Sequence, residues 1–506
     1  MAQQLQNITI NAPAFFGLNT QDSPINLDSS FASIADNCVI DKSGRIAARK
    51  GWDEVSTNGS NVLGSSRGIE TIFEFVKRDG TKIVFSAGNN KIFTGTTTLA
   101  EVTLPVGYSI TANNWKIVSF NNDIYFFQRG HAALVSVAGS TTLVKVVDGS
   151  HYAPEANEVL AAYGRLWATD VTGNKHTVYW SDTLDGDDWH GGTAGSLDVT
   201  TVFPTGFDEI TALAAHNGFL IIFGRKSILV YSGASSPASM TLTDTIEGVG
   251  CIERDSVQHT GTDLIFLSDS GVRSFGRTIQ EKSMPMRDIS RNVRNDLLAL
   301  VSQQTDPIKS VYSADEAFYL LTLPNNSIVY CFDMRAPLQD GSHRATTWSA
   351  LNPLALTVLD DGTIYIGKDS GIVKYNGYKD GTAEYQMRYF SHFLDFGNAS
   401  NLKFLKKFEL TIVGGKDTAT TLNWAYDYSS GYSKQSFTFG ASSIAEYGIS
   451  EYNTSAEYSA SILINRPKVN TSGSGEVITT GIEAQISGSA FSIQKIDIHA
   501  LMGRLI

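Results

Sequence analysis

A two-strand unit recurs along the chain and constrains its fold more than any other feature. Each copy starts with a polar turn, continues as a short strand rich in aromatic and β-branched residues, turns at Gly, Asn or Asp, and ends in a second strand. The copies start at residues 79, 122, 163, 217, 261, 315 and 361, so consecutive starts lie 43, 41, 54, 44, 54 and 46 residues apart. Four-stranded propeller blades repeat at about 40–50 residues.

Radial packing explains why such a unit would repeat. A single four-stranded blade cannot bury both of its apolar faces, whereas blades arranged in a ring cover one another and expose only short edges. We therefore predict an all-β chain with a β-propeller of roughly six to eight blades, in which each unit is the inner hairpin of one blade. A β-sandwich or several small barrels is the competing architecture, and the regular spacing favours the propeller.

The sequence pattern changes near residue 385. The strands expected beyond Tyr385 are longer and alternate apolar with polar residues, which predicts a separate antiparallel β-sandwich or platform domain over residues 385–506. We expect the propeller at residues 61–384. Residues 1–60 form an N-terminal segment that we expect to pack with the platform, because the chain must enter and leave a closed ring.

Few short helices are expected, and residues 288–301 contain the clearest one. Ile289, Val293 and Leu297 share one face at helical spacing. Asp288 or Ser290 is the candidate N-cap, since a short polar side chain can accept a hydrogen bond from the first helical turn.

The charge is acidic and unevenly distributed. Lys and Arg number 39 against 51 Asp and Glu, a net charge of −12, and from Tyr385 onward ten basic residues balance ten acidic ones. The whole excess of acid therefore lies in residues 1–384. A protein that binds nucleic acid by neutralising phosphates needs a basic face, so this composition argues against such a binder.

No arrangement of residues in the sequence indicates catalysis. The acid-rich loop Asp182–Asp188 is the best candidate cation site, because calcium prefers converging oxygen ligands, but its spacing is not that of an EF-hand and a solvated loop is the alternative. The segments 268–271 and 369–371 resemble the Asp boxes of propeller sialidases only in part and are better explained as hairpin turns. The nine histidines are scattered without metal-ligand spacing. We predict no enzymatic activity, no cofactor and no metal site.

Other residue types suggest structural roles. Lys403, Lys406 and Lys407 form the densest basic run, which we interpret as the outer face of a strand. The three cysteines, at 38, 251 and 331, are far apart and are expected to be buried small hydrophobes in a chain made in a reducing compartment. The first residues lack a secretory pattern and no stretch approaches 18 apolar residues, so we expect a soluble protein without a membrane-spanning segment.

The order of several motifs resembles the tail nozzle proteins of short-tailed bacteriophages, also called tail tubular or stabilisation proteins. The N-terminal motifs are Phe15-Phe-Gly-Leu-Asn19, Ala35-Asp-Asn-Cys38 and Gly44-Arg-Ile-Ala-Ala-Arg-Lys-Gly51-Trp52. Later motifs in the same order are Tyr163-Gly-Arg-Leu-Trp167, Val178-Tyr-Trp-Ser-Asp182, Leu220-Ile-Ile-Phe-Gly-Arg-Lys-Ser-Ile228, Phe266-Leu-Ser-Asp-Ser-Gly-Val272 and Ile496-Asp-Ile-His-Ala-Leu-Met-Gly-Arg504. The resemblance covers most of residues 15–380 and, more weakly, the C-terminal end.

This resemblance implies a structural virion protein, made in the host bacterial cytoplasm and located in the phage tail. It implies a homohexameric ring below the adaptor and portal, which extends and gates the channel for genomic DNA and offers attachment surfaces for fibres or spikes. The residues that carry the N-terminal motifs are the candidate assembly residues: Phe15, Phe16, Gly17, Asn37, Gly44, Arg49, Gly51 and Trp52. Six chains of −12 would carry about −72, and a negative wall would let DNA slide without sequence-specific binding.

The alternative function is a propeller-type receptor- or glycan-binding tail component. Aromatic side chains in loops, Trp189 among them, could stack on sugar rings. Binding of the single chain to glycans would favour this alternative, whereas association with portal–adaptor particles would favour the nozzle.

Overall fold

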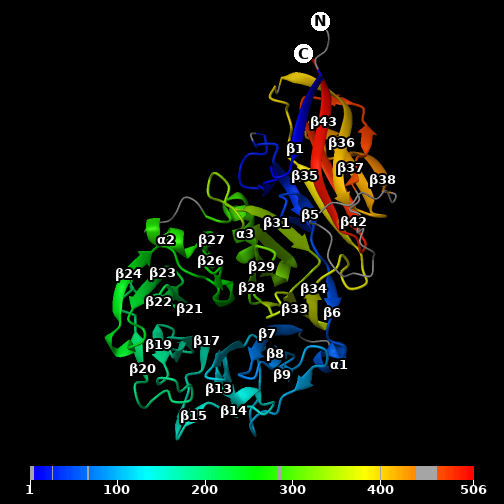
Figure 1. Cartoon of the computed structure of the whole chain (residues 1–506). Coiled ribbons are helices and arrows are strands. Elements are labelled where there is room, and N and C mark those ends of the chain that lie inside the picture. The colour runs from blue at the N-terminus through cyan, green and yellow to red at the C-terminus, as the bar shows by residue number, and fades with distance from the viewer. Residues whose placement is uncertain are drawn as a thin grey trace.

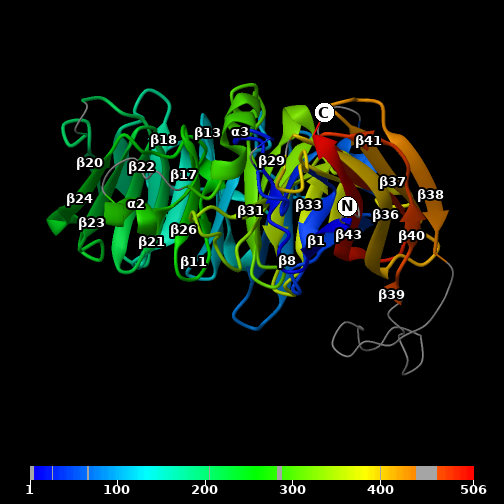
Figure 2. The same ribbon diagram turned by 90° about the horizontal axis from the view of Figure 1, so that it is seen from above.

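Two β-rich parts make up the molecule, a ring of small sheets and a two-layered β-sandwich that contains both ends of the chain (Figure 1 and Figure 2). The computed structural model describes residues 5–25, 27–64, 68–203, 206–281, 288–398, 400–439 and 464–505. The predicted all-β class, with a propeller and an antiparallel sandwich, is confirmed.

The ring contains six four-stranded blades and one three-stranded sheet within the described residues. The first blade contains β7 (Ile69–Val76), β8 (Lys82–Gly88), β9 (Lys91–Thr94) and β10 (Ala100–Glu101), and the second contains β11 (Lys116–Phe120), β12 (Asp123–Gln128), β13 (His131–Ser136) and β14 (Val144–Lys145). The third blade contains β17 (Ala156–Ala162), β18 (Arg165–Val171), β19 (Thr177–Trp180) and β20 (Gly195–Asp198). The fourth contains β21 (Ile210–His216), β22 (Phe219–Gly224), β23 (Ser227–Ser232) and β24 (Thr241–Glu247). A hairpin of β15 (Val147–Asp148) and β16 (His151–Tyr152) projects between the second and third blades.

The ring continues with the three-stranded sheet and two further blades. The three-stranded sheet contains β25 (Gln258–His259), β26 (Leu264–Ser268) and β27 (Gly271–Ser274). The next blade contains β28 (Lys309–Ser313), β29 (Phe318–Leu323), β30 (Ile328–Asp333) and β31 (Arg344–Ser349). The last blade contains β32 (Ala355–Val358), β33 (Ile364–Lys368), β34 (Gly371–Tyr375) and β6 (Trp52–Glu54). The first strand of each sheet lies nearest the axis, where β11 contacts β17, β17 contacts β21, and β28 contacts β32.

The recurring sequence units are therefore the two middle strands of each four-stranded blade and strands β26 and β27 of the three-stranded sheet, and not the inner hairpin that we predicted. The middle strands have paired neighbours on both edges and sheets on both faces, so they are the most apolar; β22, for example, is buried along nearly its whole length. The inner strands carry more polar residues because they face the axis, as Lys116 and Glu158 do. The pattern thus identifies the most buried strands.

The last blade takes its outer strand from the N-terminal part of the chain. Trp52 pairs with Tyr375, Asp53 with Lys374 and Glu54 with Val373, so β6 closes the ring against β34. Residues 52–54 therefore lie in the propeller, although the sequence placed the whole of residues 1–60 outside it. A strand from the distant N-terminus completes the ring because it supplies the hydrogen bonds that an open last blade would leave unpaired.

The sandwich is built from both ends of the chain. One layer contains β36 (Asn401–Gly414) and β43 (Phe491–Leu505), with β1 (Leu5–Asn11), β4 (Cys38–Ile40), β5 (Ile46–Ala48), β39 (Ile464–Asn465), β40 (Lys468–Asn470) and β41 (Ser474–Gly475) beside them. The N-terminal strand β1 pairs with β43 over its full length. The other layer contains β35 (Tyr385–Ser391), β42 (Ile478–Ile486), β37 (Ala419–Tyr426) and β38 (Ser433–Thr438). Phe408 and Ile498 of the first layer and Leu422 and Ile482 of the second belong to one buried core.

A continuous sheet joins the propeller to the sandwich. Strand β31 pairs with the short β2 (Gly17–Leu18), β2 pairs with β3 (Phe31–Asp36), and β3 pairs with β35 of the sandwich, which completes a ten-stranded sheet. The same buried core includes Leu321 and Phe332 of the propeller blade beside it. Backbone hydrogen bonds and apolar packing therefore run without a break from one part to the other.

Three short α-helices are present in the described residues: α1 (Gly59–Leu63), α2 (Phe275–Glu281) and α3 (Arg294–Val301). The predicted helix begins at Arg294 after a 3-10 turn, six residues later than its expected start at 288. Ser290 does not cap it, because its hydroxyl oxygen accepts the backbone N–H of Val272 at 3.0 Å. Ile289, Val293 and Leu297 are buried, as the periodicity predicted. None of the helices described is long and apolar enough to cross a membrane.

Candidate functional site

Arg49, from the N-terminal motifs, lies at the junction of the propeller and the sandwich. Its side chain is fully buried, and its two terminal nitrogens donate to the two carboxylate oxygens of Asp380 at 2.8 and 2.7 Å. The guanidinium carbon lies 4.1 Å from the centre of the Tyr385 ring. Burial disfavours the charged form of Arg49, but hydrogen bonding and attraction from Asp380 outweigh it and raise the pKa.

Asn37 holds the other side of this junction. Its backbone has a φ of 53°, a left-handed conformation that Asn tolerates better than most residues. Its side-chain oxygen accepts from Arg49 Nε at 2.8 Å and from the backbone of Ser349 at 3.1 Å, while its side-chain nitrogen donates to the carbonyl of Gln386 at 2.8 Å. One amide thus links the N-terminal segment to propeller strand β31 and sandwich strand β35.

The remaining motif residues pack close to the same junction. A Cβ at Gly51 would lie 1.8 Å from the carbonyl oxygen of Lys379, and one at Gly17 would lie 2.5 Å from that of Ala345, so neither position has room for a side chain. The other contacts are Phe15 edge-on to Tyr389, Phe16 edge-on to Phe31, Gly44 against Pro13, and Trp52 under the Lys368 ammonium. All these contacts are within one chain, and the role of the eight residues in assembly stays a prediction.

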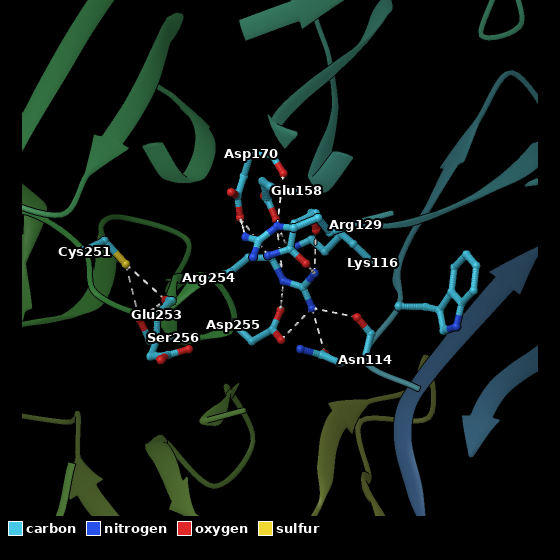
Figure 3. Close-up of polar contacts among 12 residues, drawn as sticks. Asn114, Lys116, Arg129, Glu158, Asp170, Cys251, Glu253, Arg254, Asp255 and Ser256 are labelled. Carbon is cyan, nitrogen blue, oxygen red and sulfur yellow. Dashed lines mark hydrogen bonds and ion pairs between the residues drawn. The ribbon is translucent and has the colours of Figure 1, made fainter. Parts of the chain in front are cut away.

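A second polar cluster crosses the axis of the propeller (Figure 3). Arg254 belongs to a 3-10 turn, Arg254–Ser256, that precedes the three-stranded sheet. Its guanidinium donates to the carbonyl of Asn157 at 2.5 Å, to the side chain of Asn114 at 2.7 Å, and to both carboxylate oxygens of Asp255 at 2.9 Å. Asn114 precedes the second blade and Asn157 lies in the third, so one side chain connects three sectors of the ring.

Further ion pairs extend this axial network. Lys309 of β28 donates to Asp255 at 2.7 Å and also to Asn114. Lys116 of β11 lies 3.3 Å from Glu158 of β17. At the edge of the network, Arg129 donates to Asp170, which also accepts from Asn157 at 2.9 Å. The inner strands of the second, third and sixth sheets are therefore held together by charged side chains.

The charges in the network perturb one another. Burial alone would raise the pKa of Asp255, but Arg254 and Lys309 outweigh it and hold this pKa well below its ordinary value. Burial raises the pKa of Glu158, against the opposing effects of Lys116 and Arg254. Burial, followed by repulsion from Asp255, raises the pKa of Glu253 to about 7. Desolvated ion pairs of this kind are costly to break, so the network ties these inner strands together.

In the acid-rich loop Asp182–Asp188, Asp185 and Asp188 accept hydrogen bonds from nearby backbone N–H groups. Asp185 accepts the backbone N–H of Asp187 at 2.9 Å, and Asp188 accepts those of His190 and Gly191 at 2.9 and 2.7 Å. No group of three or more His, Cys, Asp or Glu side chains in the described residues could hold a metal ion.

Two interpretations from the sequence need correction. Lys403 does not lie on the outer face of its strand: it is fully buried, and its ammonium donates to the carbonyls of Asn398 and Glu476, while Lys406 is exposed and Lys407 half-buried. Trp189 is half-buried rather than fully exposed, and its ring packs edge-on to Phe127 with 5.9 Å between ring centres, so its stacking on sugars stays a prediction. In both cases tertiary neighbours bury more of the side chain than the local pattern indicates.

Other interpretations are confirmed. Gly271 and Gly371 occupy the tight turns of the hairpins β26–β27 and β33–β34 with φ of 118° and 129°, as expected for hairpin turns. The cysteines Cys38, Cys251 and Cys331 are buried and unpaired, and burial raises the pKa of each thiol. No pattern in the sequence indicated Asp380 or the Arg254 network, because the partners lie up to 331 residues apart.

No protein-family model and no curated protein matches the chain. Three solved structures are similar to the chain. The WD40 β-propeller domain of Doa1 is 9% identical over 64% of this chain and 96% of that chain, with a TM-score of 0.37, and YCF48 from Cyanidioschyzon merolae is 13% identical over 64% of this chain and 99% of that chain, with a TM-score of 0.39. The extracellular domain of BT4673 from B. thetaiotaomicron is 12% identical over 65% of this chain and 40% of that chain, with a TM-score of 0.38. The match thus spans less than half of the last chain. The propeller assignment itself follows from the strand pairing described above.

Proposed function

We propose that this chain is a structural, propeller-type binding component of a phage tail, without enzymatic activity or a cofactor. The observation that supports this most is the ten-stranded sheet that joins propeller and sandwich, together with the buried Arg49–Asp380 pair beside it. A force or a partner acting on the propeller would be transmitted to the sandwich, because strand pairing and a shared apolar core join the two parts. A rigid two-part body suits a component that is held in an assembly at one end and presents a binding surface at the other.

Within this class we propose a tail nozzle that forms a homohexameric ring below the adaptor and portal. The ordered motifs support this role, since the N-terminal ones, Phe15–Asn19, Ala35–Cys38 and Gly44–Trp52, meet at or near the junction that sets the angle between propeller and sandwich. The axis of each propeller is occupied by the Arg254 network. The path for genomic DNA in the proposed ring would therefore run between the chains, and fibres or spikes would attach on the outside.

Electron microscopy of the purified chain and of virions tests the nozzle. The expected result is a ring with six-fold symmetry that co-purifies with portal–adaptor particles. A chain that stays monomeric at high concentration and is absent from tails would refute the nozzle. A ring whose lumen is lined by Lys and Arg would refute the idea that DNA slides past an acidic wall.

Receptor or glycan binding is the second candidate function. It is favoured by a polar cavity between the three-stranded sheet and the blade β28–β31. Binding of the purified single chain to a glycan array would support this function. If the chain binds no glycan but forms six-fold rings, receptor binding is refuted and the nozzle remains supported.

A further inference from the structure

A cavity of about 410 Å³ lies between the three-stranded sheet and the blade β28–β31. The other sheets of the ring have a fourth, outer strand in the described residues, whereas here the chain turns from β27 directly into α2. The cavity lies beside the start of α2, with Arg277 of α2, Tyr312 of β28 and His343, which precedes β31, in its lining. Its volume is within the range of sites that hold small ligands, about 300–1,000 Å³.

His343 offers a hydrogen-bond acceptor to this cavity. The residue is only 6% exposed, and its Nδ1 lies 2.8 Å from the carbonyl oxygen of Asp333. A carbonyl can only accept, so Nδ1 carries the proton and Nε2 of the neutral ring is left as an acceptor. Burial lowers the pKa of His343, and the nearby Arg277 contributes in the same direction, which keeps the ring neutral. Nε2 has no partner among the described residues.

The cation in the lining of the cavity is Arg277. Arg277 donates to the carbonyl of Gly341 at 2.6 Å and makes no ion pair with any described carboxylate. Asp263, the acid in the lining, is already satisfied by the backbone N–H groups of Leu264 and Gly276, at 2.7 and 2.8 Å, and by the hydroxyl of Ser274. These donors hold the Asp263 carboxylate on its own strand and turn, while the planar guanidinium of Arg277 is suited to a carboxylate ligand.

The rest of the lining combines hydroxyl groups with a small apolar surface. Tyr312 and Thr262 contribute hydroxyls for which no partner is present in the described part of the chain, and Ile265, Ile289 and Met334 line the apolar side. A pyranose ring has this same division between hydroxyl groups and C–H faces. We propose that the cavity binds a carboxylate-bearing sugar residue of a surface glycan, with the carboxylate on Arg277 and ring hydroxyls on His343 Nε2 and Tyr312.

This proposal rests on the receptor-binding form of the proposed function, and names its site and ligand class. The test titrates the full chain with three probes and measures binding by ligand-observed NMR and by calorimetry. They are methyl α-D-glucuronide, the matched neutral sugar methyl α-D-glucoside, and the amide of N-acetylglutamate, which has a carboxylate without a sugar ring. We expect the glucuronide to bind at least about tenfold more tightly than either of the others, as expected for a hydrogen bond to a charged group.

Two variants locate the site. R277Q removes the cation and Y312F removes one hydroxyl, and we expect each to weaken glucuronide binding, by about tenfold for R277Q and severalfold for Y312F. R78Q and Y152F are the matched controls, because Arg78 is exposed in a turn and Tyr152 is 59% exposed on the β15–β16 hairpin. Circular dichroism shows whether each variant keeps the wild-type fold.

Each outcome decides between the possibilities. Equal binding of glucuronide and glucoside, or stronger binding of the N-acetylglutamate amide, would overturn the assignment to an acidic sugar. Glycan binding that R277Q and Y312F leave unchanged would overturn this site but keep the receptor-binding function. No binding of any probe, with no signal on a glycan array, would refute the binding function itself, whereas six-fold rings would still support the nozzle.

Discussion

Replacing Arg49 with methionine removes the cation from the junction between propeller and sandwich. Asp380 would then lose both of its short hydrogen bonds, at 2.8 and 2.7 Å, in a place where its side chain is only 10% exposed. The oxygen of Asn37 would lose its donor, and the ring of Tyr385 its stacked cation. Removing one partner of a buried ion pair costs about 3–5 kcal/mol, because the other charge stays buried without compensation.

We therefore expect R49M to lower the free energy of unfolding by about 3–5 kcal/mol. Urea denaturation followed by tryptophan fluorescence measures this change as a shift of the transition in which the junction opens. The double variant R49M/D380L removes both charges, so it should recover at least half of the loss. R78M, which replaces an exposed arginine, should stay within about 0.5 kcal/mol of wild type and serves as the control.

Two results would refute this reasoning. If R49M unfolds within about 0.5 kcal/mol of wild type, the pair does not stabilise the junction. If R49M/D380L is as unstable as R49M, the cost does not come from an uncompensated carboxylate, and the apolar packing around the junction would have to explain it.

Three further predictions concern other parts of the fold. The pKa of Glu253 is raised to about 7 from an ordinary 4.5, so the folded state holds a proton that the unfolded state releases. The stability that this proton contributes is full below pH 4.5 and falls as the pH rises toward 7, by up to about 3 kcal/mol of the free energy of unfolding. Unfolding of E253Q measured from pH 5 to 8 should lack this pH dependence. Ellman's reagent at pH 8 should label none of the three buried thiols in the native chain and all three in denaturant, and rapid labelling of the native chain would contradict their burial. In G51A the new methyl group would overlap a backbone carbonyl, so the free energy of unfolding should fall by about 3 kcal/mol or more in urea denaturation. At Gly431 the nearest neighbour of an added Cβ lies at 3.5 Å, so G431A should unfold like wild type.

The sequence predicted the repeated strands well because their signals are local. Alternating apolar residues and turn-forming Gly, Asn and Asp act within a few residues, so the hairpins β22–β23 and β33–β34 could be recognised directly. The same signal misplaced each hairpin within its blade, since it reports burial and the middle strands are the most buried. It also placed the start of α3 too early, because the side chain expected to cap it bonds elsewhere.

The candidate site was predicted only in part. The ordered motifs singled out Arg49 and Asn37, but nothing near them in the sequence indicated Asp380, Ser349 or Gln386 as partners. The Arg254 network and the cavity at His343 were not foreseen at all. Their members are ordinary single residues on separate strands, and they meet only where the ring brings them together.

The amino-acid sequence by itself determined the all-β class, the number of residues per blade and the change of pattern at the platform, because side-chain alternation and turn chemistry are properties of neighbouring residues. Only the tertiary structure decided that β6 closes the ring, that β1 pairs with β43, and that Arg254 crosses the axis. These contacts join segments that are far apart in the chain. Their strength depends on burial and on the placement of a distant partner, and both exist only after the chain has folded.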